Sequence, residues 1–545
     1  MNRRDFFPAA VSLFAVPALP ADAELHADIA IIGGGVGGCA AALAVLRRGL
    51  RVILTEETDW IGGQLTSQAV PPDEHPWIEM FGCTRSYRNY RNAVRDYYRT
   101  HYQMTAAARA RVELNPGNGT VSRLTHEPRV SLAVLEEMLT PYVKQGNLRL
   151  LLRHVPVSAS TNRDQVTSVT MSDWHENVRR VLTARCFLDA TETGELLPLT
   201  NTEFVTGAET REQTHELHAQ NTATPSNNQS FTFCFAMDYQ EDEDHTIDKP
   251  ADYDRWRSYV PALDPPWVGR LLSWDMCDPK TLGKRAAYFT PNPTGAEKPG
   301  LNLWTYRRIL ARANFEPGAY PSDISLVNWP QNDYWLGDLL TATPAQKQEY
   351  LRQARQLSLS LLYWMQTEAG WKGLRLRKDV VGTEDGLAKA PYIRESRRIK
   401  AEFTVLEEHV GSQMRGDQNS AAVFADSVGV GCYRIDLHPT AGGTNYIDVG
   451  SLPFQIPLGA LLPQRVENLL PACKNIGTTH ITNGCYRLHP VEWNIGEAAG
   501  ALAAHAIDVR QTPKAIRSNM KLLADFQSSL REQGFELEWP HIHAV

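Results

Sequence analysis

One short segment late in the chain carries side chains that could move a proton. The sequence CYRIDLHP (432–439) alternates as a β-strand does, which places Arg434, Asp436 and His438 on one face. A histidine there could take a proton from a hydroxyl or an amine, while Asp436 orients it or pairs with its charge. We therefore predict His438 as a catalytic base. The alternative is a structural histidine at the end of a strand.

Other polar residues are candidates for the same site. Arg394, in the sequence IRESRR, could hold a carboxylate or polarise a carbonyl, although such a run is more often a salt-bridged, solvated face. His489 directly precedes a helix that we expect to begin near Pro490. We predict Arg394 and His489 as further catalytic residues, and Asn445 and Tyr446 as candidates for substrate contact.

The elements that must position these groups begin near the N-terminus. The segment DIAII (28–32), apolar after its first residue, reads as a buried parallel strand, and Gly33-x-Gly35-x-x-Gly38 follows it at once. A predicted helix ends at Gly49, and a second strand ends at Glu56, 18 residues after Gly38. The glycines permit a tight turn and close approach to a pyrophosphate at a helix N-terminus, and the acid is placed to accept ribose hydrogen bonds. This spacing predicts nucleotide-binding roles for Gly33, Gly35, Val36, Gly37, Gly38 and Glu56. We expect Glu57, one residue further on, to point the other way.

A second glycine pair distinguishes between nucleotides. Gly62-Gly63-Gln64 begins six residues after Glu56, and the stretch TEETDWIGGQ resembles the extended fingerprint of FAD-dependent oxidoreductases with the glutathione-reductase-like fold. The resemblance implies that FAD is the cofactor. It also implies that Gly62, Gly63 and Gln64 approach the flavin side.

Two more segments extend this resemblance. The turn DATETGELLPL is similar to one that closes over the adenosine half in this family, which implies contacts from Ala190 and Thr191; Glu192 stands where the pattern often has glycine. Val155 falls where such proteins contact adenine. The segment 465–507 resembles the last FAD-binding segment, which implies roles for Gly477 and Gly496 and a helix N-terminus aimed at the flavin.

These features predict an α/β protein with a Rossmann-like FAD-binding domain of the glutathione-reductase type and an inserted α+β substrate domain. We expect the first part of the FAD-binding domain at 24–200, the substrate domain at 201–430, the C-terminal part of the FAD-binding domain at 431–508, and a C-terminal helix and tail at 509–545. Within the substrate domain, a helix capped by Thr343 should end at Gly370.

Composition and the N-terminus restrict the other partners. The net charge of −7 disfavours nucleic acid, and the body has no apolar run long enough to span a membrane. Residues 1–23 contain Arg3-Arg4, an apolar stretch and Ala21-Asp22-Ala23, the layout of a twin-arginine signal peptide, so we expect a folded, exported protein in the periplasm or outside the cell. The eight cysteines form no C-x-x-C pair, so we predict no metal site.

An arginine stripe is the remaining charged feature. Arg88, Arg91, Arg95 and Arg99 fall on one face of a predicted helix, where they could meet an anionic substrate or, more commonly, pair with acids elsewhere.

The functional prediction is an FAD-dependent oxidoreductase, a dehydrogenase or oxidase that transfers a hydride between a small organic substrate and the flavin. Electrons would then leave to oxygen, a quinone or an electron carrier. One alternative is a flavin-binding protein whose FAD is structural or non-redox. A nicotinamide-dependent dehydrogenase is the other, but a second complete glycine fingerprint is not evident in the sequence.

Overall fold

The computed structural model describes residues 24–294 and 299–540. The predicted export signal at 1–23 lies outside this part of the chain. A parallel sheet carries the first glycine turn. Its strands lie in the order β24 (Leu469–Pro471), β8 (Cys186–Asp189), β2 (Ile29–Ile32), β3 (Val52–Glu56) and β4 (Leu148–Leu152). The central strand β2 is buried along its whole length, which explains its uninterrupted apolar sequence.

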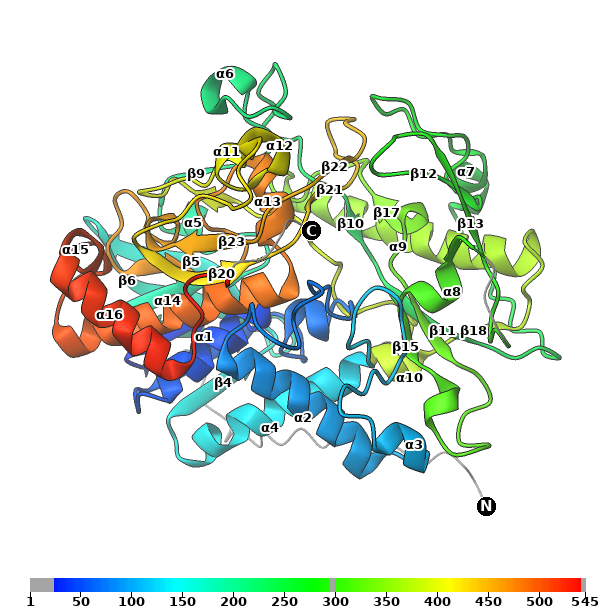
Figure 1. Ribbon diagram of the computed structural model, residues 1–545, viewed down its shortest axis with the longest axis horizontal. Helices are drawn as coiled ribbons and strands as arrows, with labels where there is room; N and C mark the ends of the chain where they lie inside the picture. Colours follow the sequence, from blue (N-terminus) through cyan, green and yellow to red (C-terminus); the bar gives the residue numbers. More distant parts are fainter. Residues whose placement is uncertain (1–23, 295–298, 541–545) are drawn as a thin grey trace.

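Two helices pack together against this sheet. Helix α1 (Val36–Leu46) follows the glycine turn, and helix α14 (His489–Val509) comes from the end of the chain to lie beside it (Figure 1). A β-carbon at Gly496 would lie 2.1 Å from the carbonyl oxygen of Gly37, and one at Gly500 would lie 2.4 Å from that of Ala41. Glycines in α14 therefore allow the two backbones to touch.

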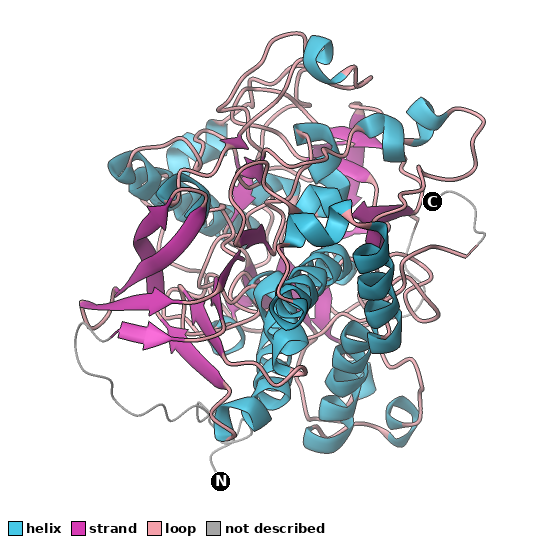
Figure 2. Ribbon diagram, turned by 90° about the vertical axis from the view of Figure 1, so that its left-hand side faces the viewer, coloured by secondary structure: helices cyan, strands magenta, loops and turns pink. Residues whose placement is uncertain are grey.

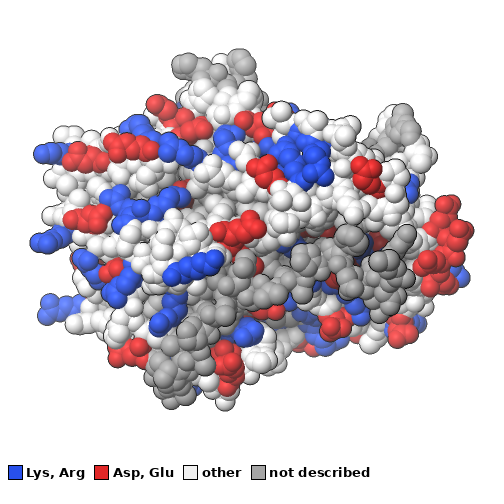
Figure 3. All heavy atoms as spheres, turned by 90° about the horizontal axis from the view of Figure 1, so that it is seen from below, with Lys and Arg blue, Asp and Glu red and all other residues white. Residues whose placement is uncertain are grey.

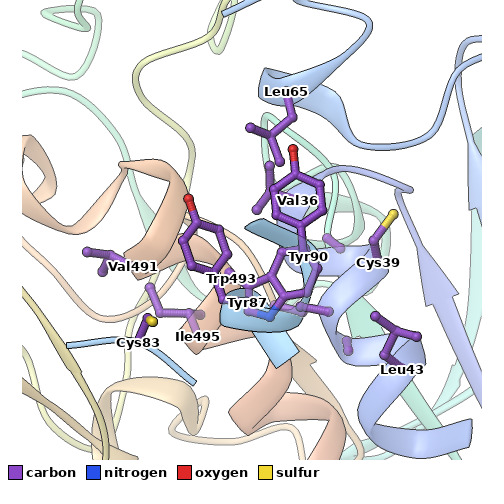
Figure 4. Packing of buried hydrophobic residues seen from close by; sticks show 14 of the residues in the cluster. Val36, Cys39, Leu43, Leu65, Cys83, Tyr87, Tyr90, Val491, Trp493 and Ile495 are labelled. Atoms are coloured by element: carbon purple, nitrogen blue, oxygen red, sulfur yellow. The ribbon is translucent and has the colours of Figure 1, made fainter. Parts of the chain in front are cut away.

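Aromatic rings fill the space beside this helix pair. The Trp493 ring lies 5.5 Å from the ring centroids of both Tyr87 and Tyr90, which project from helix α2 (Arg85–His101) toward α1 and α14 (Figure 4). The Trp493 indole N–H donates to the Ser86 hydroxyl at 2.8 Å, so its one polar atom is satisfied in the core.

The arginine stripe on α2 is structural. Arg91 is fully buried between Glu74 and Glu79, at 2.8 and 2.7 Å, and Arg95 pairs with Glu79 at 2.5 Å. These arginines hold the segment that precedes α2. Pairing with internal acids, one of the two interpretations of the stripe, is found for Arg91 and Arg95, whereas Arg88 donates to the carbonyls of Ile78 and Glu79.

A second sheet lies at the edge of the molecule. The predicted meander forms β5 (His154–Asn162) and β6 (Gln165–Asp173), which continue through β7 (Val178–Thr183) to β1 (Glu24–His26). Figure 2 shows these long strands grouped on one side. The turn between β5 and β6 falls at Arg163, whose φ of 52° is left-handed.

The central part of the chain has a hydrophobic core of its own. It surrounds a sheet with the order β15 (Arg308–Leu310), β16 (Ile324–Val327), β11 (Phe235–Tyr239) and β18 (Leu374–Leu376), and it includes the buried rings of Trp256, Trp304 and Trp329. Helix α9 (Pro344–Thr367) packs on this core (Figure 1). Its N-cap is Thr343, whose hydroxyl accepts from the Gln346 N–H, so the predicted helix start is confirmed.

The remaining elements are short connections or covering layers. The helices are α3 (Ala106–Arg109), α4 (Pro128–Lys144), α5 (Leu196–Leu199), α6 (Arg211–Thr214), α7 (Tyr253–Ser258), α8 (Leu303–Tyr306), α10 (Lys378–Val381), α11 (Glu407–Val410), α12 (Ser412–Arg415), α13 (His480–Tyr486), α15 (Pro513–Ser518) and α16 (Met520–Gln533). The strands are β9 (Phe204–Val205), β10 (Phe231–Thr232), β12 (Asp275–Cys277), β13 (Lys284–Tyr288), β14 (Leu301–Asn302), β17 (Asp333–Tyr334), β19 (Arg398–Ile399), β20 (Ser427–Gly431), β21 (Ile435–Leu437), β22 (Ile447–Val449) and β23 (Phe454–Pro457).

The surface and the cysteines complete the description. On the face shown in Figure 3, basic and acidic side chains are interspersed. All eight cysteines are buried free thiols. Among the described residues, no helix combines the length and apolar character needed to cross a membrane.

Candidate active site

A cleft opens at the carboxyl ends of β2, β3 and β8, the edge where parallel sheets bind nucleotides. It holds about 790 Å³ of space including its open mouth, and Leu339, Lys347 and Leu351 from the central part of the chain form its opposite wall. We call it the glycine cleft. Six predicted cofactor residues line it: Gly33, Gly35, Glu56, Gly63, Ala190 and Thr191.

The geometry of the first turn requires glycine. Gly33 has a φ of 103°, and a β-carbon there would lie 2.3 Å from the carbonyl oxygen of Ala190. Gly35 is the N-cap of α1, so the free N–H groups at the start of this helix face the cleft. Such an N-terminus favours a phosphate, because N–H groups and the positive end of the helix dipole point at it.

Glu56 ends β3 inside the cleft. One carboxylate oxygen accepts from the Gly34 N–H at 3.1 Å, and the other accepts from the N–H and hydroxyl of Thr58 at 2.9 and 2.7 Å. Burial raises the pKa of Glu56 to about 7, although the bonds from Thr58 and Gly34 act in the opposite direction. Glu57 also lines the cleft, contrary to the expectation that it points away, because β3 ends at Glu56 and strand alternation stops there.

Several predicted cofactor residues pack against backbone and do not line the cleft. Gly37 abuts the Ala472 carbonyl and Gly38 abuts that of Gly33, so both serve helix–strand contact. Gly62 donates its N–H to the Gly34 carbonyl at 2.7 Å. Val36, the first residue of α1, is buried in the hydrophobic core.

Three more predicted cofactor residues also lie outside the cleft lining. Val155 pairs with Ser172 across β5 and β6, and its neighbours His154 and Pro156 contribute to the cleft instead. A β-carbon at Gly477 would lie 2.4 Å from that of Ala401, and Gly496 touches α1 as described above. Both glycines are thus closely packed, and their implied cofactor roles stay predictions.

Beneath the cleft lies a charged cluster that sequence reasoning did not identify. The Lys474 ammonium is buried and contacts the carboxylates of Glu192 and Glu492, the latter at 3.5 Å, and the Cys473 sulfur at 3.3 Å. The predicted residue Gln64 donates to Glu492 at 2.7 Å. Glu192, Cys473 and Glu492 converge as metal ligands could, but the ammonium already occupies a position among them. Glu192 and Lys474 lie 282 residues apart in the sequence, so no local pattern predicted this ion pair.

A second cluster contains the predicted base. The Nδ1 atom of His438 lies 2.6 Å from Asp333, and its Nε2 atom lies 3.6 Å from Asp436. Asp333 is fully buried and also accepts from Arg394 at 2.9 Å. Burial acts to raise the pKa of Asp333, but the charges of Arg394 and His438 outweigh it and hold the pKa below its usual value. The Tyr446 ring lies 5.4 Å from that of His438.

Arg394 is not on a solvated face. Its guanidinium is buried, donates to Asp333 and to the Ser230 carbonyl at 3.0 Å, and stacks over Tyr392 at 4.7 Å. It therefore positions Asp333. Asn445 donates to the Pro265 carbonyl at 2.9 Å and holds a loop.

His489 has a different environment from His438. It is fully buried, and its Nδ1 atom accepts from the Asp73 N–H at 3.1 Å. Burial and the nearby charge of Arg307 lower its pKa well below the usual value, which makes it a neutral acceptor and a weak base. Arg307 in turn pairs with the Asp73 carboxylate at 3.3 Å. The structure thus places His489 as a support for the segment around Asp73.

One extended segment joins the two sites. Pro391 and Ile393 line the glycine cleft, whereas the alternate residues Tyr392 and Arg394 point toward the His438 cluster. The Tyr392 hydroxyl accepts from Arg487 at 2.9 Å, and Arg487 also donates to Asp436 at 3.1 Å. The base and the nucleotide cleft are therefore adjacent, on opposite sides of a single stretch of backbone.

The parallel sheet, the glycine turn at the start of α1 and the acid at the end of β3 define a dinucleotide-binding α/β protein of the Rossmann-like class. The model of the family described as FAD dependent oxidoreductase matches residues 28–530, so the chain belongs to that family. A comparison with curated proteins gives no match.

Solved structures that match part of the chain include redox flavoproteins. L-proline dehydrogenase from P. horikoshii is 15% identical with a TM-score of 0.17, over 36% of this chain and 26% of that one. Glycerol-3-phosphate dehydrogenase from Bacillus halodurans complexed with FAD is 14% identical with a TM-score of 0.22, over 39% and 40%. The rebeccamycin biosynthetic enzyme RebC with reduced flavin is 15% identical with a TM-score of 0.22, over 40% and 39%. The matched region is less than half of each of these chains.

Proposed function

We propose that the protein transfers a hydride between a small organic substrate and the flavin, with His438 as the base that takes the substrate's proton. The observation that carries this proposal is the position of His438 between the carboxylates of Asp333 and Asp436, beside the segment that borders the glycine cleft. FAD, when bound, supplies the hydride acceptor or donor.

The residues of the cluster have separable tasks. Asp333 accepts from Nδ1 of His438 and orients the ring, which leaves Nε2 to meet a substrate hydroxyl or amine. Once His438 takes the proton, the two carboxylates stabilise the imidazolium. Arg394 fixes Asp333 from the opposite side. About a fifth of the His438 side chain is exposed, so a ligand can reach it from solvent, whereas Asp333 is fully buried.

The residues of the glycine cleft fit FAD. The glycine turn and the N-terminus of α1 match a pyrophosphate, and Glu56 matches a ribose hydroxyl pair.

The test is anaerobic reduction of the FAD-loaded protein with a panel of alcohols, amines and hydroxy acids, followed by flavin absorbance. We expect one class to bleach the flavin, and His438→Gln to keep the flavin spectrum but slow bleaching by about a hundredfold or more. If every class leaves the flavin oxidised, the alternative of a structural or non-redox FAD is favoured. Equal bleaching rates in the two proteins would remove His438 from the mechanism.

We further propose that electrons leave the flavin to oxygen, a quinone or an electron carrier, and that the protein is exported folded to the periplasm or beyond. The support for export is Arg3-Arg4 with the apolar stretch and small-residue site that follow. Replacing Arg3 and Arg4 with lysine should retain the protein in the cytoplasm in cell fractionation. Unchanged export would reject the twin-arginine route.

A further inference from the structure

The phosphate end of the glycine cleft contains a carboxylate. The Oε1 atom of Glu192 lies 2.9 Å from the position of a β-carbon built on Gly35 and 2.8 Å from one built on Gly63. The carboxylate is thus wedged in the space that these two glycines leave free. This space adjoins the start of α1, where an anion is favoured.

Glu192 is held there from one side. Its Oε2 atom accepts from the buried Lys474 ammonium, whereas its Oε1 atom makes no hydrogen bond among the described residues although it is shielded from solvent. A carboxylate oxygen without a donor gains hydrogen bonds when it turns toward water. The side chain is partly exposed, at 14%, so a path to solvent exists.

Lys474 can serve a second anion. Its ammonium is almost fully buried and has Glu492 at 3.5 Å as its other carboxylate neighbour. Burial acts to lower the pKa of Lys474, but the neighbouring Cys473, Glu192 and Glu492 outweigh it and raise this pKa well above the usual value, so the ammonium stays charged. If Glu192 moves away, a charged donor remains at the phosphate end of the cleft.

We infer that Glu192 and the pyrophosphate of the dinucleotide compete for one position, so that Glu192 is an internal plug which turns out of the cleft when the nucleotide binds. Lys474 exchanges the carboxylate for a phosphate oxygen. Glu192 therefore weakens dinucleotide binding, because the site gives up an ion pair before it takes the ligand. This inference concerns binding and is independent of the proposed catalytic role of His438.

The test measures the affinity of the flavin-free full chain for ADP and for adenosine by calorimetry. Adenosine has no phosphate groups, so its affinity measures binding outside the phosphate end of the cleft. Glu192→Gln should bind ADP about tenfold more tightly and leave adenosine unchanged. Glu195→Gln is the matched control, because this acid lines the same cleft but pairs with Lys347, and it should change ADP affinity by less than about twofold.

Two further variants keep the inference testable. Lys474→Met should weaken the binding of ADP and leave the affinity for adenosine unchanged. Should it fail to fold, Glu192→Asp provides the test, because the shorter carboxylate retracts from Gly35 and should also tighten ADP. The inference would be wrong if both Glu192 variants bound ADP with unchanged affinity. It would also be wrong if the affinity for adenosine rose by the same factor as that for ADP.

Discussion

The Nδ1 atom of His438 lies 2.6 Å from a carboxylate oxygen of Asp333, a residue 105 positions earlier in the chain. Asp333 is fully buried and is fixed on its other side by Arg394 and the Thr232 hydroxyl. The pair joins the central part of the chain to the residue that follows strand β21 in the C-terminal part. The orientation of the predicted base is therefore decided by a residue outside its own segment.

Asp333→Asn should slow flavin reduction by about a hundredfold or more while the protein still binds FAD. The amide can no longer stabilise an imidazolium, and it can orient the wrong tautomer. Stopped-flow absorbance with a reducing substrate measures the rate. Asp448→Asn is the control, because Asp448 pairs with Arg434, which directly precedes β21, and not with His438. A rate equal to that of the parent protein would show that Asp333 does not position the base.

Lys474→Met should lower the free energy of unfolding by about 3–5 kcal/mol, because it leaves the buried carboxylate of Glu492 and that of Glu192 without their cation. Urea unfolding measures the change. Adding Glu192→Gln and Glu492→Gln to the same chain should restore part of the loss. If the free energy of unfolding fell by less than about 1 kcal/mol, the two carboxylates would be protonated or paired with other groups in the variant.

Glu56→Gln should change how stability depends on pH. Because burial raises the folded-state pKa of Glu56 to about 7, its contribution to stability is fully present below the unfolded pKa of about 4.3 and is lost as pH rises to the folded value. Between pH 4 and pH 8 the parent protein should therefore lose about 3 kcal/mol more than the variant.

Urea unfolding of the FAD-free protein at both pH values measures this difference, which is insensitive to a constant loss of the hydrogen bonds from Gly34 and Thr58. Glu408→Gln removes an exposed carboxylate and serves as the control. Parallel pH profiles for the parent and Glu56→Gln would contradict the raised pKa.

Gly496→Ala should destabilise the protein by about 3 kcal/mol or more, because its β-carbon would lie 2.1 Å from the Gly37 carbonyl oxygen and force α1 and α14 apart. Thermal or urea unfolding measures the effect. Gly283→Ala is the matched control, since its nearest neighbour is the Thr281 hydroxyl at 3.5 Å. Equal stability of the two variants would show that the helices shift without cost.

The sequence alone determined the nucleotide-binding unit. Strand, glycine turn, helix and terminal acid follow one another within 28–56, and each is specified by neighbours a few residues away. A glycine with a φ of 103° and an uninterrupted apolar strand have local causes, so Gly33 and β2 were predictable. The same holds for α9, because its N-cap at Thr343 and the helical spacing of its apolar residues can be recognised from neighbouring positions in the sequence.

The tertiary structure decided the partners and the burial of the polar groups. The run around Arg394 is more often a solvated face, yet Arg394 is buried against Asp333. Glu192 meets Lys474 across 282 residues. Gly477 and Gly496 are glycines because distant backbones touch them. Local pattern reports which conformation a segment can adopt, whereas the charge that faces a side chain depends on how remote segments pack, and that is set by burial of the whole core.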